Sequence, residues 1–395
     1  MSSREVVFVG AARTAIGTYG GSLKDIPPAQ LGALVIKTAL ERAGVAPKDV
    51  GHVVMGSVIP TVPQDAYISR VAALEAGVPQ EAPAFNVNRL CGSGLQAIVS
   101  AAQSILLGDC DVAIGAGAES MSRGAYLVTS NRWGARMGDV KMLDYVLGAL
   151  HDPRQHIHMG ITAENVATRY DITRAQQDAY AAQSQERAAK AIAAGIFKEQ
   201  IVPVEIKTRK GTVLFDTDEG VKADTNVEAL AKMKPAFKKE DGTVTAGNAS
   251  TLNDGAAAVV MASADKAKAL GLKPLARLVS YGHAGVEPEY MGIGPVPASK
   301  AALAKAGLTV ADMDLIEANE AFAAQACAVS KEMGFPNDKT NPNGSGISLG
   351  HPIGGTGAIL VTKAIYELQR INGRYALITM CIGGGQGIAM VIERI

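Results

Sequence analysis

The residues best suited to chemistry surround Cys91, in the run Asn-Arg-Leu-Cys-Gly-Ser-Gly at 88–94. An apolar segment at 83–87 predicts a short strand before it, and apolar residues at helical spacing from Leu95 predict a helix that ends near Gly108. The partial positive charge and free N–H groups of a helix N-terminus favour a thiolate. Glycines on both sides of Ser93 leave room for a substrate. The alternative is a buried structural cysteine, which is the common state of a free thiol.

Three later segments also place reactive or polar side chains beside the end of an element. Asn-Glu-Ala-Phe at 319–322 follows a strand-like run at 315–317. Gly-His-Pro at 350–352 precedes a helix expected over 358–368, and Cys-Ile-Gly-Gly-Gly at 381–385 follows a strand expected over 376–380. Parallel-sheet proteins build their sites at such ends. Taken singly, a His before Pro is more often a core or capping residue, and a glycine triplet is more often a turn.

Other candidate motifs give weaker evidence for a functional site. The run Gly-Gly-Thr-Gly at 354–357 lacks the lysine of a P-loop and the spacing of a dinucleotide fingerprint, so nucleotide hydrolysis is disfavoured. His156 and His158 have no acidic or thiol partner at ligand spacing, and no metal is expected. Cys110 and Cys327 have bland surroundings, one in a loop and one on an apolar helix, and are interpreted as structural.

The second half of the chain repeats the first at one ungapped offset of 263 residues. The run Ala-Leu-Glu-Arg-Ala-Gly-Val at 39–45 matches Ala-Leu-Ala-Lys-Ala-Gly-Leu at 302–308. At the same offset, Cys91-Gly92-Ser93-Gly94 falls on the glycine-rich run at 354–357, and the strand at 112–114 falls on 375–377. We therefore expect two similar α/β halves, packed so that equivalent loops lie beside one shared site.

Strands alternate with helices in both halves, for example the helix expected over 30–44, the strand over 50–59 and the helix over 67–77. This alternation predicts an α/β protein with a largely parallel sheet covered on both faces. Between the halves the pattern changes, with a capping box at 173–176 before a long helix and strand-like pieces at 201–206 and 213–215. That region is interpreted as an inserted lobe for substrate or subunit contacts.

Composition narrows the class of protein. The chain has 395 residues, 48% of them hydrophobic and 19% charged, and its 38 basic residues equal its 38 acidic ones. Neither nucleic acid nor an anionic membrane is an expected partner. Four cysteines do not form a disulfide framework in so long a chain. The N-terminus resembles a first strand rather than a signal peptide, no apolar run of membrane-spanning length is expected, and the cytoplasm is the default location.

Together these motifs, with Gly-Asn-Ala-Ser at 247–250, closely resemble those of the thiolases, in the same order and along the whole chain. The resemblance implies a thiolase-like fold, with two duplicated α/β halves in αβαβα layers and an inserted loop lobe. The N-terminal half would comprise 1–120 plus 251–273, the lobe 121–250 and the C-terminal half 274–395. The implied enzyme is an acyl-CoA C-acyltransferase of the biosynthetic short-chain type, an acetyl-CoA C-acetyltransferase or β-ketothiolase, serving fatty acid metabolism or polyhydroxyalkanoate synthesis.

The resemblance also implies roles. Cys91 would carry the acyl group as a thioester, and His351 would deprotonate it. Asn319 would hold a water with which His351 stabilises the enolate of the second substrate. Cys381 would move the α-proton, and the N–H groups of Cys91 and Gly383 would form a second oxyanion hole. The reaction implied is the reversible Claisen condensation of two acetyl-CoA, or of acetyl-CoA and a short acyl-CoA, to 3-ketoacyl-CoA and CoA.

The coenzyme A substrate would be held by residues that match the family's contacts. His158 is typical of the biosynthetic branch, whereas Lys222 stands where related enzymes often carry arginine. The expected substrate-binding residues are Ser250, His158, Met159, Leu150, Lys222, Phe237, Ala246 and Phe322. No metal and no dissociable cofactor would be needed, and the family's usual assembly is a homotetramer, a dimer of dimers.

Several alternatives stay open from the sequence. A degradative 3-ketoacyl-CoA thiolase of broader chain length would share every motif. A decarboxylating ketoacyl synthase would share the fold and the nucleophile but carry His or Asn in place of Cys381. A hydrolase could use Cys91, His351 and Asn319 without Cys381. If the chain is not an enzyme, it could be a thiolase-like carrier that binds CoA without turnover.

Overall fold

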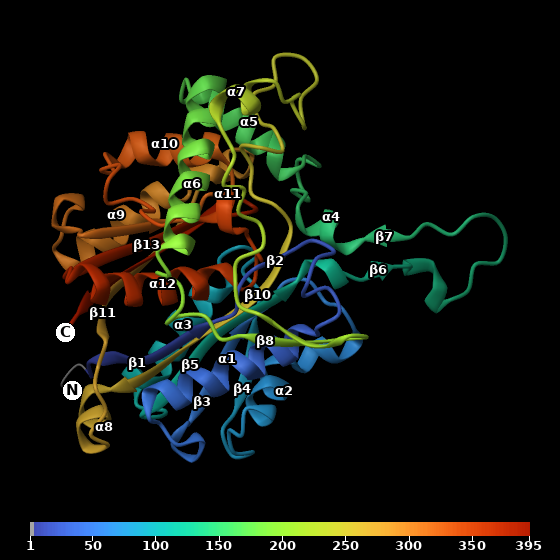
Figure 1. The fold of residues 1–395 in the computed structure, drawn as a ribbon. Helices are drawn as coiled ribbons and strands as arrows, with labels where there is room; N and C mark the ends of the chain where they lie inside the picture. Colours follow the sequence, from blue (N-terminus) through green and yellow to red (C-terminus); the bar gives the residue numbers. More distant parts are fainter. Residues whose placement is uncertain (1–3) are drawn as a thin grey trace.

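The structure is a computed structural model that describes residues 4–395 (Figure 1). Its strands are β1 Val6–Arg13, β2 Gly17–Thr18, β3 His52–Gly56, β4 Ala84–Val87, β5 Val112–Ser120, β6 Tyr126–Leu127, β7 Leu143–Asp144, β8 Val204–Thr208, β9 Gly211–Phe215, β10 Asn253–Ser263, β11 Ala276–Gly285, β12 Leu315–Ala318, β13 Tyr375–Ile382 and β14 Gln386–Arg394. Its α-helices are α1 Pro28–Ala43, α2 Ile68–Glu75, α3 Ser93–Leu107, α4 Tyr145–Ala149, α5 Met159–Arg169, α6 Arg174–Ala193, α7 Val227–Ala231, α8 Ala264–Ala269, α9 Pro295–Ala306, α10 Ala323–Met333, α11 Gly346–Leu349 and α12 Thr356–Ile371.

The main sheet has two matching halves. Its strand order is β12-β13-β14-β11-β1-β10-β5-β3-β4, with β2 paired to β10. The halves meet where β1 pairs with β11, at Val7 opposite Arg277 and Phe8 opposite Ala276. From that seam β10, β5 and β3 follow on one side, and β14, β13 and β12 follow on the other. Helix α3 begins at Ser93 and α12 at Thr356, 263 residues later, as the repeat predicts.

The prediction of a largely parallel sheet is wrong. Only the pairs β3–β4, β3–β5 and β12–β13 are parallel. The remaining pairs of the main sheet are antiparallel. The reason is that β14 follows β13 through a turn at 383–385, and β10 returns to β5 after the lobe. The turn at 383–385 is too short for the crossover that parallel neighbours require.

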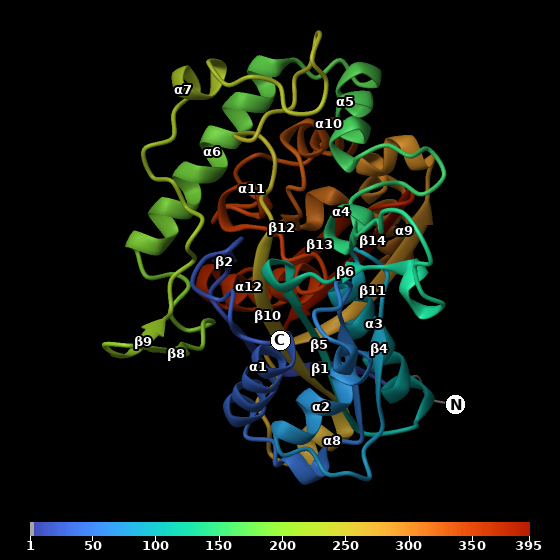
Figure 2. The same ribbon diagram turned by 90° about the vertical axis from the view of Figure 1, so that its right-hand side faces the viewer.

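Helices and sheet form five layers (Figures 1 and 2). Helices α3 and α12 pack on each other between the two halves of the sheet, with α1 and α2 outside one half and α9 and α10 outside the other. Two glycines that the repeat makes equivalent allow the close contact of α3 and α12. A Cβ atom at Gly94 would lie 2.8 Å from the nitrogen of Ala358, and one at Gly357 would lie 2.2 Å from the nitrogen of Leu95.

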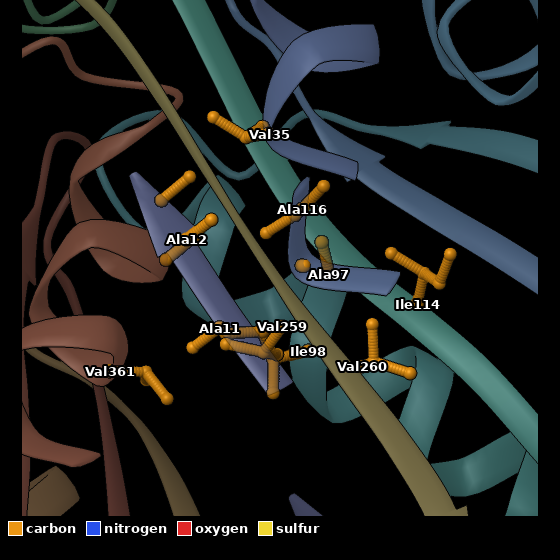
Figure 3. Packing of buried hydrophobic residues seen from close by; sticks show 14 of the residues in the cluster. Ala11, Ala12, Val35, Ala97, Ile98, Ile114, Ala116, Val259, Val260 and Val361 are labelled. Carbon is orange, nitrogen blue, oxygen red and sulfur yellow. The ribbon is translucent and has the colours of Figure 1, made fainter. Parts of the chain in front are cut away.

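Small and β-branched residues fill the largest core cluster (Figure 3). Ala11, Ala12 and Val259 come from the adjacent strands β1 and β10, and Ile98 comes from α3. All four side chains are fully buried. Alternating branched and small side chains let helices approach the sheet closely, and burial of this apolar surface contributes about 25 cal/mol per Å².

The region between the halves contains the predicted helix and strands. Thr173 and Gln176 form the expected capping box at the start of α6, and β8 pairs with β9. The segment from β6 to β7 forms an arm that projects from the body (Figure 1), and it exposes Trp133 and Met137. Strand β10, which follows this region, pairs with β1 and β5. The residue limits proposed for the three domains stay a prediction.

One apolar run is longer than the sequence analysis expected. The window Leu90–Leu107 has the 18 residues and the mean hydropathy, 1.4, that would suit a membrane span, so that prediction is wrong. More than half of the window is buried inside the protein, where α3 packs against β3 and β5. A core helix of a layered α/β fold explains this composition.

Candidate active site

Cys91 lies on a tight turn between β4 and α3, as predicted. Leu90, just before it, has a φ of 46°, in the left-handed region that a branched side chain rarely adopts. Ser93 holds this turn: its hydroxyl accepts the N–H of Arg89 at 2.9 Å and donates to the carbonyl of Leu90 at 2.6 Å. Strain of this kind, held by surrounding hydrogen bonds, is typical of functional turns.

The surroundings of the Cys91 thiol are apolar but include two backbone donors. The N–H groups of Gly383 and of Cys91 itself lower the pKa of the thiol and so favour the thiolate. Burial outweighs them, helped by the negative charge of Glu119, and raises the pKa of the Cys91 thiol to about 11. The expectation that the helix N-terminus yields a thiolate is therefore wrong for the free protein. The thiol keeps its proton at neutral pH and needs a base to react.

His351 has the geometry and charge state of such a base. Its backbone N–H donates to Asn253 Oδ1 at 2.9 Å, and its Nδ1 lies 2.7 Å from Thr356 Oγ1. The Thr356 hydroxyl donates its proton to the carbonyl of Pro352 at 2.9 Å, so its oxygen accepts from Nδ1–H. This assignment leaves a lone pair on Nε2. Burial lowers the pKa of His351 to about 4, so the ring is neutral at physiological pH.

Asn319 lies against the imidazole of His351. Its Nδ2 is 3.4 Å from Nε2 and 3.5 Å from Nδ1 of that ring, and its Oδ1 is buried without a hydrogen-bond partner among residues 4–395. A Cβ atom at Gly346 would lie 2.8 Å from Asn319 Oδ1, which shows how closely the backbone of α11 approaches this amide. Strand β12 and helix α11 thus fix Asn319 from two sides.

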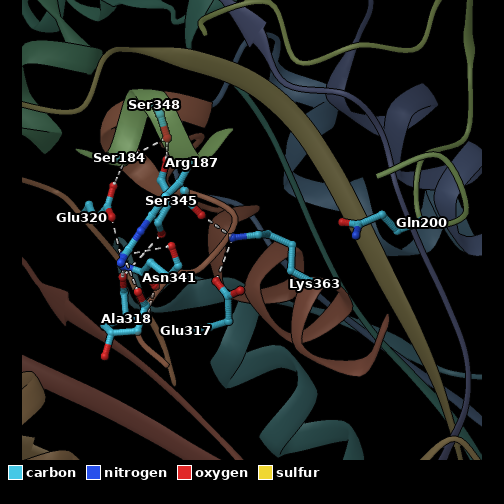
Figure 4. A network of polar contacts seen from close by, with 12 residues as sticks. Ser184, Arg187, Gln200, Glu317, Ala318, Glu320, Asn341, Ser345, Ser348 and Lys363 are labelled. Atoms are coloured by element: carbon cyan, nitrogen blue, oxygen red, sulfur yellow. Dashed lines mark hydrogen bonds and ion pairs between the residues drawn. The ribbon is translucent and has the colours of Figure 1, made fainter. Parts of the chain in front are cut away.

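A buried polar network lies next to Asn319 in the chain (Figure 4). Glu320 accepts hydrogen bonds from Ser184 at 2.6 Å and from Asn341 at 3.0 Å. Beside it, Lys363 forms a buried ion pair of 2.7 Å with Glu317 and donates to the carbonyl of Gly344 at 2.7 Å. Among residues 4–395 Glu317 Oε1 has no hydrogen-bond partner, and the other bonds, made inside a low-dielectric core, rigidify the ends of β12 and α11.

Cys381 lies within β13 rather than after it, two residues before Gly383. Its side chain is fully buried, and burial together with the nearby Cys91 raises the pKa of its thiol well above the usual range. The glycines at 384 and 385 both have positive φ and form the turn into β14. A Cβ atom at Gly385 would lie 2.3 Å from the carbonyl oxygen of Val286, so the third glycine of the motif is required by close backbone contact.

Two apolar clusters contain the residues around the two cysteines. One contains Val58, Ile59 and Ile353, with Cys91 and Leu150 packed against it. The other contains Cys381 and Met159, and the Met159 sulfur would be 3.3 Å from a Cβ atom at Gly383. The structure therefore places the predicted residue Leu150 in the cluster beside Cys91 and Met159 in the cluster of Cys381.

An aromatic stack begins at His158, next to Met159 in the chain. The His158 ring stacks on Phe237 at 4.7 Å, and Phe237 meets the edge of Phe322 at 6.2 Å. His158 Nδ1 accepts the N–H of Gly160 at 3.0 Å and caps α5, so Nε2 carries the ring proton. Burial, with a contribution from His151, lowers the pKa of His158 to about 4. A neutral, stacked ring of this kind suits an uncharged chain such as pantetheine.

The remaining predicted substrate contacts lie further out. Ser250 is half-buried, and its N–H donates at 2.9 Å to the carbonyl of Ala321, next to Phe322. Ala246 and Lys222 are exposed. Lys222 donates its backbone N–H to Gln185 at 2.8 Å, and no contact joins its side chain to the catalytic group among residues 4–395.

Three residues beside the predicted set were missed. Thr356 orients His351, Asn253 anchors the backbone of His351, and Glu119 binds the loop at Gly354. The repeat held a signal for Thr356, because it is the counterpart of Ser93, and both hydroxyls bond back to the loop before their helix. Asn253 and Glu119 lie on strands far away in sequence and left no local signal.

Fold and site define a two-half α/β protein whose site holds two cysteines and a histidine, and comparison with known families identifies its class. Residues 6–265 match the N-terminal domain of thiolases, and residues 272–394 match their C-terminal domain. The chain belongs to the thiolase family. The predicted family and its fold class are confirmed.

Individual relatives cover the whole chain. It is 67% identical over 393 residues to the β-ketothiolase BktB of Cupriavidus necator, with 100% of both chains covered. It is 52% identical to an acetyl-CoA acetyltransferase of Chromobacterium violaceum, covering 99% of this chain and 100% of that one. Human mitochondrial 3-ketoacyl-CoA thiolase matches at a TM-score of 0.97 and 45% identity, with 100% of both chains covered.

Proposed function

We propose that this thiolase is a β-ketothiolase that joins two acetyl-CoA, or acetyl-CoA and a short acyl-CoA, into 3-ketoacyl-CoA and CoA, and that it also catalyses the reverse thiolysis. The observation that carries the proposal is that the backbone N–H groups of Cys91 and Gly383 favour a charged Cys91 sulfur near the buried Cys381. The full-length similarity to a β-ketothiolase and to acetyl-CoA acetyltransferases supports the same reaction.

In the first half-reaction the acetyl group of acetyl-CoA is transferred to Cys91. His351 Nε2 takes the thiol proton as the sulfur attacks the carbonyl carbon, and the Cys91 and Gly383 N–H groups stabilise the oxyanion. The C–S bond to coenzyme A breaks, and His351 returns the proton to the leaving thiolate. An oxyanion-hole donor of this kind contributes about 3 kcal/mol to transition-state stabilisation.

In the second half-reaction a carbon–carbon bond forms. Cys381 passes its thiol proton to the neutral His351 and, as thiolate, removes a proton from the α-carbon of the second acyl-CoA. The protonated His351 and a water held by Asn319 then stabilise the enolate oxygen. The enolate carbon attacks the acyl carbon on Cys91, and the Cys91 thiolate leaves and takes the proton back from His351. This stabilisation of the enolate oxygen is needed because a thioester α-proton is too weakly acidic for a base alone.

The substrate follows the aromatic stack. Met159, Phe237 and Phe322 would line the pantetheine chain near His158, Ser250 and Ala246 would contact it further out, and Lys222 would meet the nucleotide end. Leu150 would line the acyl group. The proposal needs no metal or cofactor.

The proposal also includes assembly and location. The arm between β6 and β7 supports a homotetramer, since its exposed Trp133 and Met137 need a covering surface. The protein would act in the cytoplasm. A role in fatty acid metabolism or in polyhydroxyalkanoate synthesis stays a prediction.

Two assays test the reaction. Acetyl-CoA alone should give acetoacetyl-CoA, and acetoacetyl-CoA plus CoA should give acetyl-CoA. Dependence on a malonyl-thioester would identify a ketoacyl synthase, and release of free acetate would identify a hydrolase. A second candidate, a degradative thiolase of broader chain length, is favoured by the similarity to the human 3-ketoacyl-CoA thiolase. Thiolysis rates for four- to eight-carbon 3-ketoacyl-CoA substrates separate the two.

A further inference from the structure

Glu119 is a buried carboxylate whose partners come from both halves of the protein. It lies near the end of β5 and is fully buried. One oxygen accepts the N–H of Ile59 at 3.0 Å, and the other accepts those of Val58 at 3.1 Å and Gly354 at 2.8 Å. Within residues 4–395 it forms no salt bridge, so backbone N–H groups alone compensate this carboxylate.

The segments that Glu119 joins are the loop after β3 and the loop between His351 and α12. They belong to different halves, and Ile59 and Gly354 are 295 residues apart in a chain of 395. A Cβ atom at Gly354 would lie 2.6 Å from Glu119 Oε2 and 2.9 Å from Ser57 Cα. Glycine at 354 is therefore what lets this backbone reach the carboxylate.

Both joined loops line the side of Cys91 where the acyl group would lie. Val58, Ile59 and Ile353 form one buried apolar cluster against which Cys91 and Leu150 pack. Gly354 is three residues after His351, and Thr356, which orients His351, is two residues further. A shift of the carboxylate would therefore move both the apolar wall and the base.

We propose that Glu119 is a positioning residue that clamps these two loops together, and so sets both the placement of His351 in the site and the acyl chain length that the site accepts. This inference rests on the proposed function, because it names the residue that shapes the acyl side of the same site.

The charge of Glu119 supplies a readout that a purely structural role would not affect. The titratable groups that face it are Asp254 on β10 and Cys91 before α3. Burial, with the charge of Asp254, raises the pKa of Glu119 to about 8 against the three N–H bonds that lower it. In its charged form it raises the pKa of Cys91. Removing the charge should make Cys91 more reactive above pH 8.

The test compares Glu119→Gln, Glu119→Asp and the parent enzyme. Gln keeps the shape but loses the charge and presents an NH₂ group to backbone donors. We expect kcat of Glu119→Gln to fall about 10- to 100-fold. The ratio of kcat/KM for four-carbon to that for six-carbon 3-ketoacyl-CoA should change about threefold or more. One methylene group in a fitted pocket changes kcat/KM about tenfold. Iodoacetamide should alkylate Cys91 faster above pH 8. Glu119→Asp, which keeps the charge, should show the same alkylation profile as the parent.

Glu393→Gln is the matched control, because Glu393 is a buried carboxylate at the far end of β14, bonded to Arg277 and Arg374. It should leave chain-length preference and Cys91 alkylation unchanged. If Glu119→Gln lowers only the melting temperature, with parent chain-length ratio and alkylation profile, the proposal is wrong. If the glutamine variant does not fold, Gly354→Ala tests the same contact, and an unaltered chain-length ratio there also overturns the proposal. A parent enzyme without thiolysis would instead refute the proposed function.

Discussion

The Thr356 hydroxyl lies 2.7 Å from His351 Nδ1 and 2.9 Å from the Pro352 carbonyl that takes its proton. This pair of bonds makes Nδ1 the protonated nitrogen and Nε2 the base. The counterpart of Thr356 in the first half is Ser93, whose hydroxyl braces the turn at Cys91. The two halves thus use equivalent hydroxyls to orient the nucleophile and its base.

Replacement of Thr356 by valine should slow acylation. Thr356→Val keeps the shape but leaves Nδ1–H without an acceptor, so the imidazole loses its fixed tautomer and orientation. We expect the single-turnover rate of Cys91 acylation to fall about 10- to 100-fold. Rapid-quench measurement with acetyl-CoA gives this rate. Thr356→Ser, which keeps the hydroxyl, should stay near the parent rate, and an equal loss in both variants would refute the role of the hydrogen bond.

The acid limb of activity should lie well below the ordinary pKa of histidine. Burial depresses the pKa of His351 from 6.5 to about 4. The neutral ring that accepts the Cys91 proton is thus present above pH 4 and is lost as pH falls through that value. The same depression contributes stability above pH 6.5 that decreases as pH falls from 6.5 toward 4. The pH profile of kcat/KM for thiolysis measures this, and a loss of activity centred at pH 6.5 would contradict the assignment.

The buried pair Lys363–Glu317 should matter strongly for stability. Lys363→Met leaves the carboxylate of Glu317 in the core without its cation, which costs about 3–5 kcal/mol. Urea unfolding should show the loss. The double variant Lys363→Met with Glu317→Leu removes both charges and should recover much of the stability. If the single variant is as stable as the parent, the pair does not hold the polar network together.

The contact between α3 and α12 should tolerate no added methyl group. Gly357→Ala would place a Cβ atom 2.2 Å from the backbone nitrogen of Leu95, and backbone atoms cannot move aside as a flexible side chain can. We expect a loss of about 1–3 kcal/mol or more, measured as a lower melting temperature. Gly148→Ala is the control, since it lies in α4 with no atom within 4 Å of the added Cβ, and it should be neutral or slightly stabilising.

The sequence was most informative where chemistry is local. The glycine-flanked segments around Cys91, Asn319, His351 and Cys381 contain their own turn signals. The structure brings Asn319 against His351 and Cys381 near Cys91. The 263-residue offset also placed the starts of α3 and α12 correctly, because a helix start depends on residues close in the chain.

Other features depend on partners distant in sequence. Strand direction was mispredicted because β10 carries mostly small residues and returns from the lobe, and nothing in that run specifies an antiparallel partner. The pKa of Cys91 was misjudged because the helix N-terminus is visible in the sequence and burial is not. Glu119 was missed because its donors, such as Gly354, become neighbours only when the two halves pack.

The role of Cys91 as the acyl carrier can be tested by measuring the acylation of cysteine variants. The parent enzyme, Cys91→Ser and Cys381→Ser would each be mixed with acetyl-CoA, digested and mapped by mass spectrometry. In this role Cys91 should carry an acetyl group in the parent and in Cys381→Ser, almost none should form in Cys91→Ser, and Cys381→Ser should condense poorly. Equal acetylation of Cys91→Ser and the parent would contradict it.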